Sequence, residues 1–114
     1  MAADCLFCKI VAGQLPATVV YRDDRLVAIR DIHPVAPTHI LLMPTRHLGS
    51  MDEAASGDAD LIGVLHLSAA RIAAQEGLNQ GYRLVTNTGR DGGQTVGHLH
   101  IHLLGGRGMR WPPG

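Results

Sequence analysis

The stretch GHLHIHLLGG, residues 97–106, carries the main information about the fold. Histidines alternate with apolar residues in it, and alternate side chains of a β-strand point to opposite faces of a sheet. We therefore predict a strand over residues 98–104. Its first face carries His98, His100 and His102, and its second face carries the apolar residues between them, which point toward a core.

Three neighbouring imidazoles on one sheet face favour a functional surface. A neutral imidazole offers one donor and one acceptor and titrates near neutrality. It can attack phosphorus, transfer a proton or bind a metal. Two alternatives remain open: a solvated strand face, and a catalytic zinc held by all three rings. Zinc fits less well, because alternate strand residues lie about 7 Å apart and zinc–nitrogen bonds are about 2 Å long.

A glycine-rich loop precedes this strand. The segment NTGRDGGQT, residues 87–95, combines glycines, which let a backbone approach an anion closely, with neutral polar side chains. It lacks the lysine of a P-loop, and no helix is predicted after it. The loop alone is weak evidence for phosphate binding.

Composition excludes several classes of protein. The 114 residues include ten basic and ten acidic side chains, so the formal net charge is zero. This balance argues against nucleic acid or an anionic membrane as a partner. No apolar stretch approaches the length of a membrane span, and the N-terminus does not resemble a signal peptide, so we expect a cytoplasmic protein. In that setting the CxxC pair, Cys5 and Cys8, favours metal or redox chemistry over a disulfide.

Periodicity and turn residues predict one α+β domain over residues 1–114, with about five antiparallel strands and one main helix packed on them. The expected elements are a short helix at 4–11, strands at 18–22, 26–31, 39–44, 82–87 and 98–104, and a helix from Asp58 that stops at Gly77. Residues 50–56 are polar and are expected to be loose. The apolar face of the main helix is predicted to consist of Leu61, Leu65 and Ile72, widened by Val64 and Leu67.

The HxHxH pattern occurs here together with CLFCKIVAGQLPATVVYRDD (5–24), RDIHPVAPTHILLMP (30–44), GYRLVTNTGRDGGQTVGHLHIHLLGGR (81–107) and the terminal WPPG. Together these segments resemble the histidine triad (HIT) superfamily of nucleotide hydrolases and transferases, and within it the Hint branch. The fragile-histidine-triad branch usually follows its histidines with Pro-Arg, whereas this chain has Gly105-Gly106-Arg107. The resemblance covers nearly the whole chain.

The resemblance implies a purine nucleoside phosphoramidase of the adenosine 5′-monophosphoramidase type. His100 would be the nucleophile that forms a nucleotidyl-histidine intermediate, with its second nitrogen bonded to a backbone carbonyl near His98. His102 would lie against the phosphate, and His39 would complete the histidine cluster. Two rivals stay open: a hydrolase of dinucleoside polyphosphates or aminoacyl adenylates, and a nucleotide-binding regulator with incidental hydrolysis.

The resemblance also implies a nucleotide site. Asn87, Gly93, Gln94 and Thr95 would hold the phosphate, and Asp31 would accept both ribose hydroxyls. Thr95 replaces the usual serine that faces the leaving amine; it keeps the hydroxyl and stiffens χ1. The positions that wall the base pocket are Leu6, Phe7, Ile10, Ile29, Ile32 and Leu41, for each of which simple core packing is the alternative.

The same resemblance supplies a ligand set for a structural zinc: Cys5, Cys8, His47 and His98. Two thiolates and two imidazoles suit tetrahedral zinc. The alternative is that both cysteines are reduced core residues of the first helix. The two remaining histidines, His33 and His66, match no site position and are predicted to be surface or structural residues.

The tail holds the only tryptophan, Trp111, in a segment too rich in glycine and proline for a helix or central strand. A tryptophan at a chain end leaves a large apolar ring in water unless a partner covers it. By the resemblance, we expect a homodimer with a continuous sheet of about ten strands and Trp111 near the partner's leaving-group site. A disordered tail is the alternative.

Overall fold

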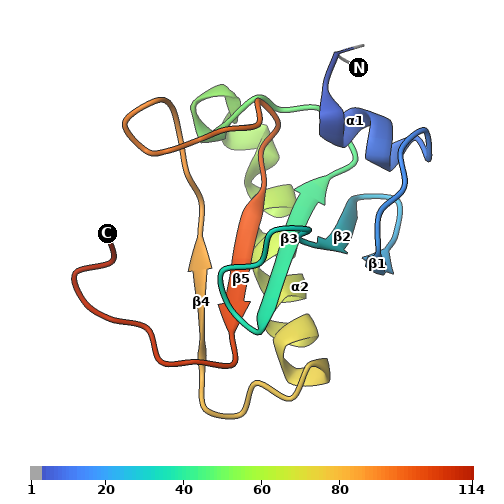
Figure 1. Ribbon diagram of the computed structural model, residues 1–114. Coiled ribbons are helices and arrows are strands. Elements are labelled where there is room, and N and C mark those ends of the chain that lie inside the picture. The colour runs from blue at the N-terminus through green and yellow to red at the C-terminus, as the bar shows by residue number, and fades with distance from the viewer. Residues whose placement is uncertain (1–3) are drawn as a thin grey trace.

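The structure is a computed structural model that describes residues 4–114, so residues 1–3 of the predicted domain lie outside the described part. The elements run as follows (Figure 1): α1 Leu6–Val11, β1 Val19–Arg22, β2 Leu26–Arg30, β3 Thr38–Pro44, the 3-10 turns Met51–Glu53 and Ser56–Asp58, α2 Ala59–Gln75, β4 Tyr82–Val85 and β5 Ile101–Gly105. The predicted α+β class and the element order are confirmed.

All neighbouring strands are antiparallel, in the spatial order β1-β2-β3-β5-β4. Hairpin-like turns join β1 to β2 and β2 to β3, while α2 carries the chain from β3 to the far edge, where β4 lies. The last strand then inserts between β3 and β4. This insertion places the histidine-bearing strand beside β3 near the middle of the sheet (Figure 1).

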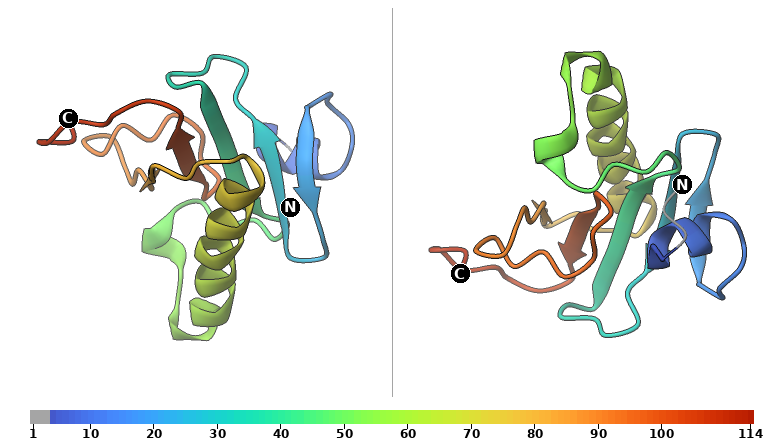
Figure 2. Two further views of the ribbon diagram at one scale, coloured as in Figure 1. Left: turned by 90° about the horizontal axis from the view of Figure 1, so that it is seen from below. Right: turned by 90° about the horizontal axis from the view of Figure 1, so that it is seen from above.

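The sheet separates two apolar clusters. The long helix α2 covers one face, and the short helix α1 covers part of the other face near β2 and β3 (Figure 2). Alternation along the strands explains this: in β3, Ile40 and Leu42 belong to the cluster under α2, while Leu41 and Met43 belong to the cluster under α1. The face under α1 is also the face of the histidines.

Helix α2 packs through a stripe of small and branched residues. Leu65, Ala69 and Ile72 are at least 97% buried, and truncating a buried leucine such as Leu65 to alanine costs about 2–5 kcal/mol. The prediction that Leu67 widens this stripe is wrong, because its side chain is 68% exposed. The helix ends before Gly77, whose φ of 74° is the left-handed conformation of a helix stop.

The histidine strand is shorter than predicted, because β5 begins at Ile101 and not at residue 98. The pairing of Leu42 with Ile101, continued outward, sets Leu99 opposite Pro44, which has no N–H for the ladder. The N–H of Leu99 instead donates to the carbonyl of Leu48, at 2.6 Å. Residues 98–100 therefore lie outside the strand ladder, with a bend at His98.

A smaller difference concerns the loop between β3 and α2. The segment 50–56, predicted to be loose, contributes a 3-10 turn at Met51–Glu53 and the start of a second, Ser56–Asp58. The side chain of Ser50 caps the first turn by accepting the N–H of Asp52. Within the described residues, no helix has the length and apolar character that a bilayer span requires.

Candidate functional site

The three histidines of the 98–102 segment all lie on the α1 side of the sheet, as alternation predicts. The Phe7 ring of α1 meets His98 and His100 edge-on, with ring centroids 5.9 and 5.0 Å away. His98 is fully buried and His100 is 6% exposed. The three rings nevertheless face different neighbours, so a single metal held by all three is not the arrangement found.

The His98 ring belongs to a cluster of sulfur and nitrogen atoms. Its Nδ1 lies 3.3 Å from Cys5 Sγ, 3.6 Å from Cys8 Sγ and 3.2 Å from His47 Nδ1. Cys8 and His47 also contact each other, with Cys8 Sγ 3.2 Å from His47 Nδ1. The structure thus brings together all four predicted metal ligands, from α1, the loop after β3 and the start of the histidine segment.

The four atoms have the spacing of a metal site. Zinc bonds of about 2.0–2.3 Å in a tetrahedron separate the ligand atoms by roughly 3.3–3.8 Å. The contacts of 3.2–3.6 Å in this cluster, henceforth the thiol–imidazole cluster, are close to that range. The donor set therefore fits zinc.

The ring of His98 is oriented for ligation. Its Nε2 lies 2.9 Å from the carbonyl oxygen of Pro44, which can only accept, so Nε2 carries the proton and donates it. The lone pair is then on Nδ1, which faces the sulfurs. Burial lowers the pKa of His98, with the Pro44 carbonyl opposing the shift, so the neutral ring that a metal requires is favoured.

The sequence places both sulfurs by forming the first turn of α1. Cys5 is the N-cap residue, and its Sγ accepts the N–H of Cys8 at 3.3 Å. This capping contact does for a thiol what serine or aspartate does elsewhere. The spacing of three residues brings the second sulfur to the same end of the helix, against His47.

The ring of His100 is held through its backbone neighbour. His100 Nδ1 lies 2.7 Å from the carbonyl oxygen of His98, so Nδ1 is protonated and donates. The opposite nitrogen, Nε2, carries the lone pair. The expectation of a same-segment carbonyl partner for His100 is met by this contact.

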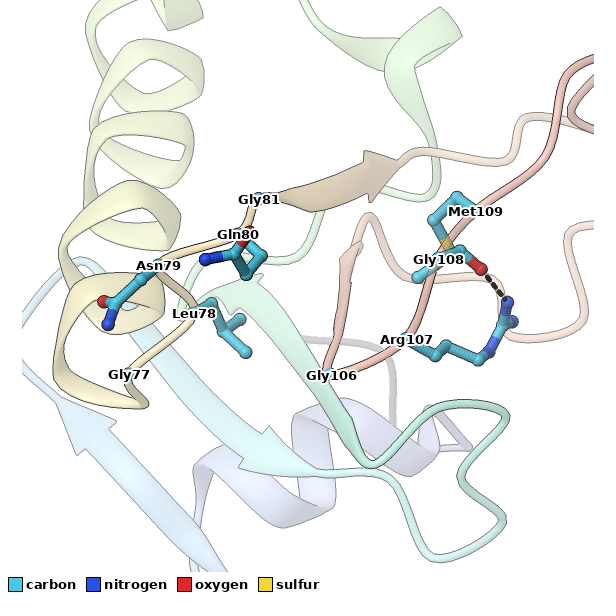
Figure 3. A pocket seen from close by; sticks show the side chains of 9 residues that line it. All are labelled: Gly77, Leu78, Asn79, Gln80, Gly81, Gly106, Arg107, Gly108 and Met109. Atoms are coloured by element: carbon cyan, nitrogen blue, oxygen red, sulfur yellow. Dashed lines mark hydrogen bonds between the residues drawn. The ribbon is translucent and has the colours of Figure 1, made fainter.

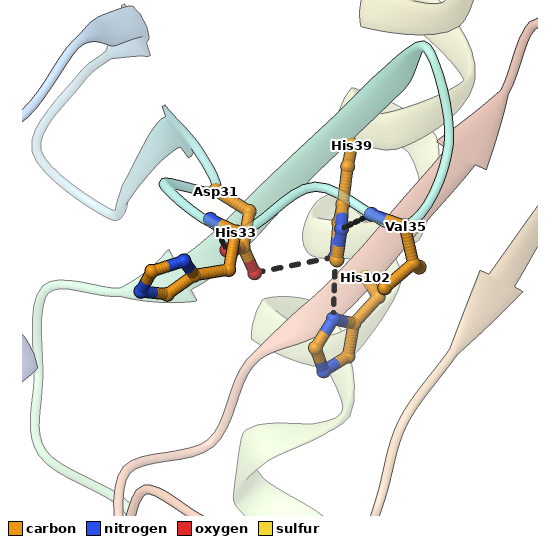
Figure 4. A network of polar contacts seen from close by, with 5 residues as sticks. All are labelled: Asp31, His33, Val35, His39 and His102. Carbon is orange, nitrogen blue, oxygen red and sulfur yellow. Dashed lines mark hydrogen bonds and ion pairs between the residues drawn. The ribbon is translucent and has the colours of Figure 1, made fainter.

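A second cluster consists of Asp31, His39 and His102 (Figure 4). His39 Nε2 lies 2.9 Å from His102 Nδ1 and 3.4 Å from Asp31 Oδ2. The carboxylate also accepts the N–H of His33 through Oδ1, at 2.7 Å. We call these three residues the carboxylate–imidazole cluster.

One backbone contact determines which ring nitrogens of this second cluster carry protons. The N–H of Val35 donates to His39 Nδ1 at 3.1 Å, so that nitrogen holds a lone pair (Figure 4). In the neutral ring the proton is then on Nε2, which donates to His102 Nδ1. His102 in turn keeps its proton on Nε2, which points away from His39 in Figure 4.

Both rings of this pair favour the neutral state. Burial lowers the pKa of His39, opposed by the Asp31 carboxylate. Burial is also the main cause that lowers the pKa of His102 to about 4, followed by repulsion from His100 and His39. Because His39 Nε2 carries a proton, it offers no lone pair, and the carboxylate–imidazole cluster does not fit a metal in this arrangement.

The glycine-rich loop is closed by Gln94. Its Oε1 accepts the N–H of Gly89, and its Nε2 donates to the carbonyls of Gly49 and Val96, at 2.7 and 3.0 Å. Its backbone N–H donates to Gly89. All donors of Gln94 are thus used inside the protein, and its binding of phosphate stays a prediction, as do the roles of Asn87, Gly93 and Thr95.

A hollow of about 620 Å³ lies beside this loop. Its polar walls are His47, Ser50, Glu53, Arg90, Gln94 and Thr95. Thr95 also borders a second hollow of about 460 Å³, next to Cys5. Both hollows border the thiol–imidazole cluster, since His47 lines each of them and Cys5 lines the second.

The predicted base-pocket positions divide into two groups. Phe7, Ile10, Ile29 and Leu41 form one buried apolar cluster under α1, beside His100. Ile32 is 84% exposed and Leu6 is 46% exposed. The register aligns Ile29 with Leu41, and Leu41 with His102, so this cluster adjoins the second histidine cluster.

Three predicted positions lie outside both clusters. Trp111 is 82% exposed, and His33 and His66 are exposed as expected. His66 Nδ1 contacts the carbonyl of Ile62 one helical turn away, at 2.9 Å. Sequence reasoning missed Val35 and Pro44, because they act through backbone groups, for which side-chain identity carries no signal.

Comparisons with known proteins can now be set beside this geometry. The family model of the HIT domain matches residues 12–109 of the sequence. The chain belongs to the HIT domain family. An uncharacterized HIT-like protein of Synechococcus elongatus is 53% identical over 114 residues, which is the full length of both chains. A 14 kDa zinc-binding protein of Brassica juncea is 47% identical over 113 residues, covering 97% of this chain and 100% of the relative.

A solved structure supports the same family. The crystal structure of a HIT family hydrolase from Legionella pneumophila matches with a TM-score of 0.96 and 49% identity, covering 97% of this chain and 100% of that one. The fold is therefore that of a HIT family hydrolase. The plant relative is named a zinc-binding protein, and the thiol–imidazole cluster of this chain could hold a metal ion.

Proposed function

We propose that this HIT protein is a purine nucleoside phosphoramidase of the Hint branch, acting on substrates such as adenosine 5′-monophosphoramidate. The observation that carries the proposal is the 2.7 Å contact between His100 Nδ1 and the His98 carbonyl oxygen. It leaves a nucleophilic lone pair on Nε2 of a ring that is 6% exposed. A buried, aimed imidazole is what covalent catalysis at phosphorus needs.

In the first step, His100 Nε2 forms a bond to the α-phosphorus, and the bond from phosphorus to the amine nitrogen breaks. The amine leaves with the bonding electron pair and takes up one proton from solvent, relayed by the hydroxyl of Thr95. His100 becomes a nucleotidyl-imidazolium. Its Nδ1–H then donates a charge-assisted hydrogen bond to the His98 carbonyl, which is stronger than the neutral one.

In the second step, a water oxygen attacks phosphorus and the phosphorus–Nε2 bond breaks. The water gives up one proton, the nucleoside monophosphate is released, and His100 returns to its neutral state. Throughout, the His98 carbonyl keeps the proton on Nδ1, so that Nε2 is the nitrogen that forms and then breaks the bond to phosphorus. One difficult displacement is thereby divided into two easier ones.

His102 supports both steps as a neutral donor. The chain of contacts through His39 leaves a proton on His102 Nε2, and its pKa of about 4 keeps the ring uncharged at neutral pH. We propose that this N–H donates to a phosphate oxygen, where negative charge grows in the transition state. Such preorganised donors are often the largest contribution to catalysis.

We propose that the nucleoside half of the substrate binds at the apolar cluster under α1 and at Asp31. The buried apolar cluster of Phe7, Ile10, Ile29 and Leu41 offers a wall for a base, with Leu6 and Ile32 at its exposed rim. Asp31 keeps Oδ2 beside His39 and is the proposed acceptor for the ribose hydroxyls. Ile29 stands where an aromatic is frequent in the family, so we expect packing on the base rather than ring stacking.

Steady-state kinetics on a fluorogenic adenosine phosphoramidate test the proposal. We expect His100→Ala to lose at least about 1,000-fold in kcat, the scale for removing a nucleophile. Trapped protein should carry the nucleotide on residue 100. Retention of more than a tenth of wild-type kcat, or an adduct on His98 or His102, contradicts the assignment.

The same assay separates the rival activities. A dinucleoside polyphosphate and an aminoacyl adenylate are offered as competing substrates at equal concentration. If either has the higher kcat/KM, the phosphoramidase proposal fails in favour of that rival. If none is turned over while nucleotide still binds, the protein is a binding regulator and not an enzyme.

We further propose that the thiol–imidazole cluster holds one structural zinc ion. The support is the tetrahedral spacing of its four ligand atoms and the oriented Nδ1 lone pair of His98. Bound zinc would supply a crosslink between α1 and the histidine segment. It would take no part in the bond-making steps, because His100 Nε2 belongs to neither cluster.

We also propose that the protein is a C2 homodimer. Its support is an edge strand, β4, with Tyr82 42% exposed, and a helix whose Leu67 is 68% exposed. Pairing through these surfaces would extend the sheet to ten strands and cover Trp111. Sedimentation at micromolar concentration tests this, and a single species of 12.2 kDa contradicts it.

A further inference from the structure

The chain that leaves β5 packs against the loop between β2 and β3, which holds Asp31 of the carboxylate–imidazole cluster. Gly106 has a φ of 89°, and a Cβ at this position would lie 2.8 Å from the Cβ of Pro37. Only glycine allows this approach without a shift. The next residue, Arg107, is thereby brought beside residues 31–39.

The guanidinium of Arg107 makes two contacts with backbone carbonyls. Its Nε donates to the carbonyl oxygen of Val35 at 3.0 Å, and its Nη1 donates to that of Gly108 at 3.1 Å. Figure 3 shows the second contact. A hollow of about 490 Å³ separates this part of the tail from the Gly77–Gly81 turn, and the Arg107 side chain extends away from that turn. The side chain thus crosslinks the tail to the loop.

Val35 is the residue whose N–H sets the protons of the second cluster. Its carbonyl is held by Arg107, and its N–H donates to His39 Nδ1 at 3.1 Å. The side chain of Val35 is 59% exposed and gives the loop little apolar anchoring. Arg107 therefore restrains a segment that packing restrains weakly.

We propose that Arg107 is a positioning residue for His39 and His102. By holding Val35, it keeps the Val35 N–H on His39 Nδ1 and the proton on His39 Nε2, and so keeps the proton of His102 on the outward Nε2. Without this restraint, His39 can also adopt the tautomer with Nδ1 protonated. The donor at His102 Nε2 is then present in only part of the molecules. The kinetic part of this inference rests on the proposed function, but the tautomer part does not.

The test compares Arg107→Gln with Arg110→Gln. Arg110 is a matched control, because it lies in the same tail and carries the same charge, and its described contact, with Arg83, is made by the backbone carbonyl. The first readout is the tautomer of His39 and His102 in nitrogen-15 NMR spectra. We expect mixed tautomers in Arg107→Gln and unchanged spectra in Arg110→Gln.

The second readout is kinetic. Arg107→Gln should lower kcat by about fivefold, the factor of one ordinary hydrogen bond, with KM changed less than kcat. Lysine at this position should not rescue, because its single ammonium cannot reproduce the Nε and Nη1 pair. Unchanged tautomers in Arg107→Gln overturn the proposal, as does an equal loss of kcat in both glutamine variants.

A second variant breaks the next contact along the same pathway, the one between the Val35 N–H and His39 Nδ1. Val35→Pro has no N–H to offer His39, so it should give the same mixed tautomers. Adding Arg107→Gln to it should then lower kcat by less than about twofold further, since the two changes break one pathway. Full additivity contradicts the proposal. Absence of phosphoramidase activity in the wild type would defeat the proposed function alone, because the NMR result still decides the role of Arg107.

Discussion

The thiol–imidazole cluster and the carboxylate–imidazole cluster look alike by composition. Each gathers titratable side chains with ligand atoms within 4.8 Å of one another, and each takes one histidine from the 98–102 segment. They differ in where the backbone places the protons. At His98 a backbone carbonyl accepts a hydrogen bond from Nε2–H, so the lone pair on Nδ1 faces the cluster. At His39 an N–H occupies Nδ1, so a proton faces the cluster.

This difference separates a cluster that fits a metal ion from a hydrogen-bond chain that fixes one donor. A metal needs lone pairs that converge, and the first cluster supplies two from histidine and two from sulfur. A hydrogen-bond chain needs an alternation of proton and lone pair, and the second cluster supplies it from Val35 through His39 to His102. His100 lies between them, held by the backbone of the first cluster and in ring contact with the second at 5.0 Å.

The largest expected effect concerns the metal. Cys8→Ser should reduce bound zinc from about one per chain to none after metal-replete expression, because a hydroxyl is a poor substitute for a thiolate. At free zinc of 100 times its Kd, the wild type gains about 2.7 kcal/mol in unfolding free energy that the variant lacks. Elemental analysis and denaturant unfolding measure both. Zinc retained in the variant, or no zinc in the wild type, breaks the comparison.

The next effect concerns the proton chain. His39→Phe keeps a ring but removes both nitrogens, so His102 loses its donor. We expect kcat to fall by about 100-fold, the lower end of the range for general acid–base groups. His39→Gln can still donate from Nε2 and should recover part of the loss. Zinc content should be unchanged in both. A parallel loss of zinc would mean that the clusters are not independent.

The sequence predicted the fold and the composition of the thiol–imidazole cluster more fully than the chemistry of either cluster, and it did not predict that Asp31 lies beside His39. Alternation placed His98, His100 and His102 on one face, and the structure has them there. The strand start at residue 98 was wrong because Pro44 interrupts the ladder across from Leu99. A tertiary contact of this kind has no local pattern.

The proton positions of His98 and His39 could not be predicted, since they depend on backbone partners, whereas the carbonyl partner of His100 was expected from the family resemblance. The carbonyl of Pro44 and the N–H of Val35 decide the roles of His98 and His39, and any residue in the same conformation offers the same carbonyl. Gln94 is a similar case. Its side chain closes the loop through hydrogen bonds that its place in the sequence did not indicate, and its binding of phosphate stays a prediction.

A smaller effect is the pH dependence of stability from His102. Its folded pKa of about 4 lies below the unfolded value near 6.5. The unfolded chain therefore binds more protons between these values, and the unfolding free energy should fall as pH drops from about 6.5 toward 4. His102→Asn should flatten this slope by at most about 1.4 kcal/mol per pH unit. Urea unfolding of chelated protein measures it, and an unchanged slope contradicts the neutral ring.

The smallest effect is expected at a histidine that belongs to neither cluster. His66 is exposed on α2, and its Nδ1 meets only the carbonyl of Ile62 among the contacts found in the described part of the chain. His66→Ala should change the unfolding free energy by less than about 0.5 kcal/mol, as for surface substitutions generally. Zinc content and kcat should equal those of the wild type within error. Because His66→Ala removes an imidazole just as His39→Phe does, it tests whether the losses above follow from position or from the loss of any histidine. A change in zinc or a tenfold loss of kcat in His66→Ala would remove the distinction between the clusters and the rest of the surface.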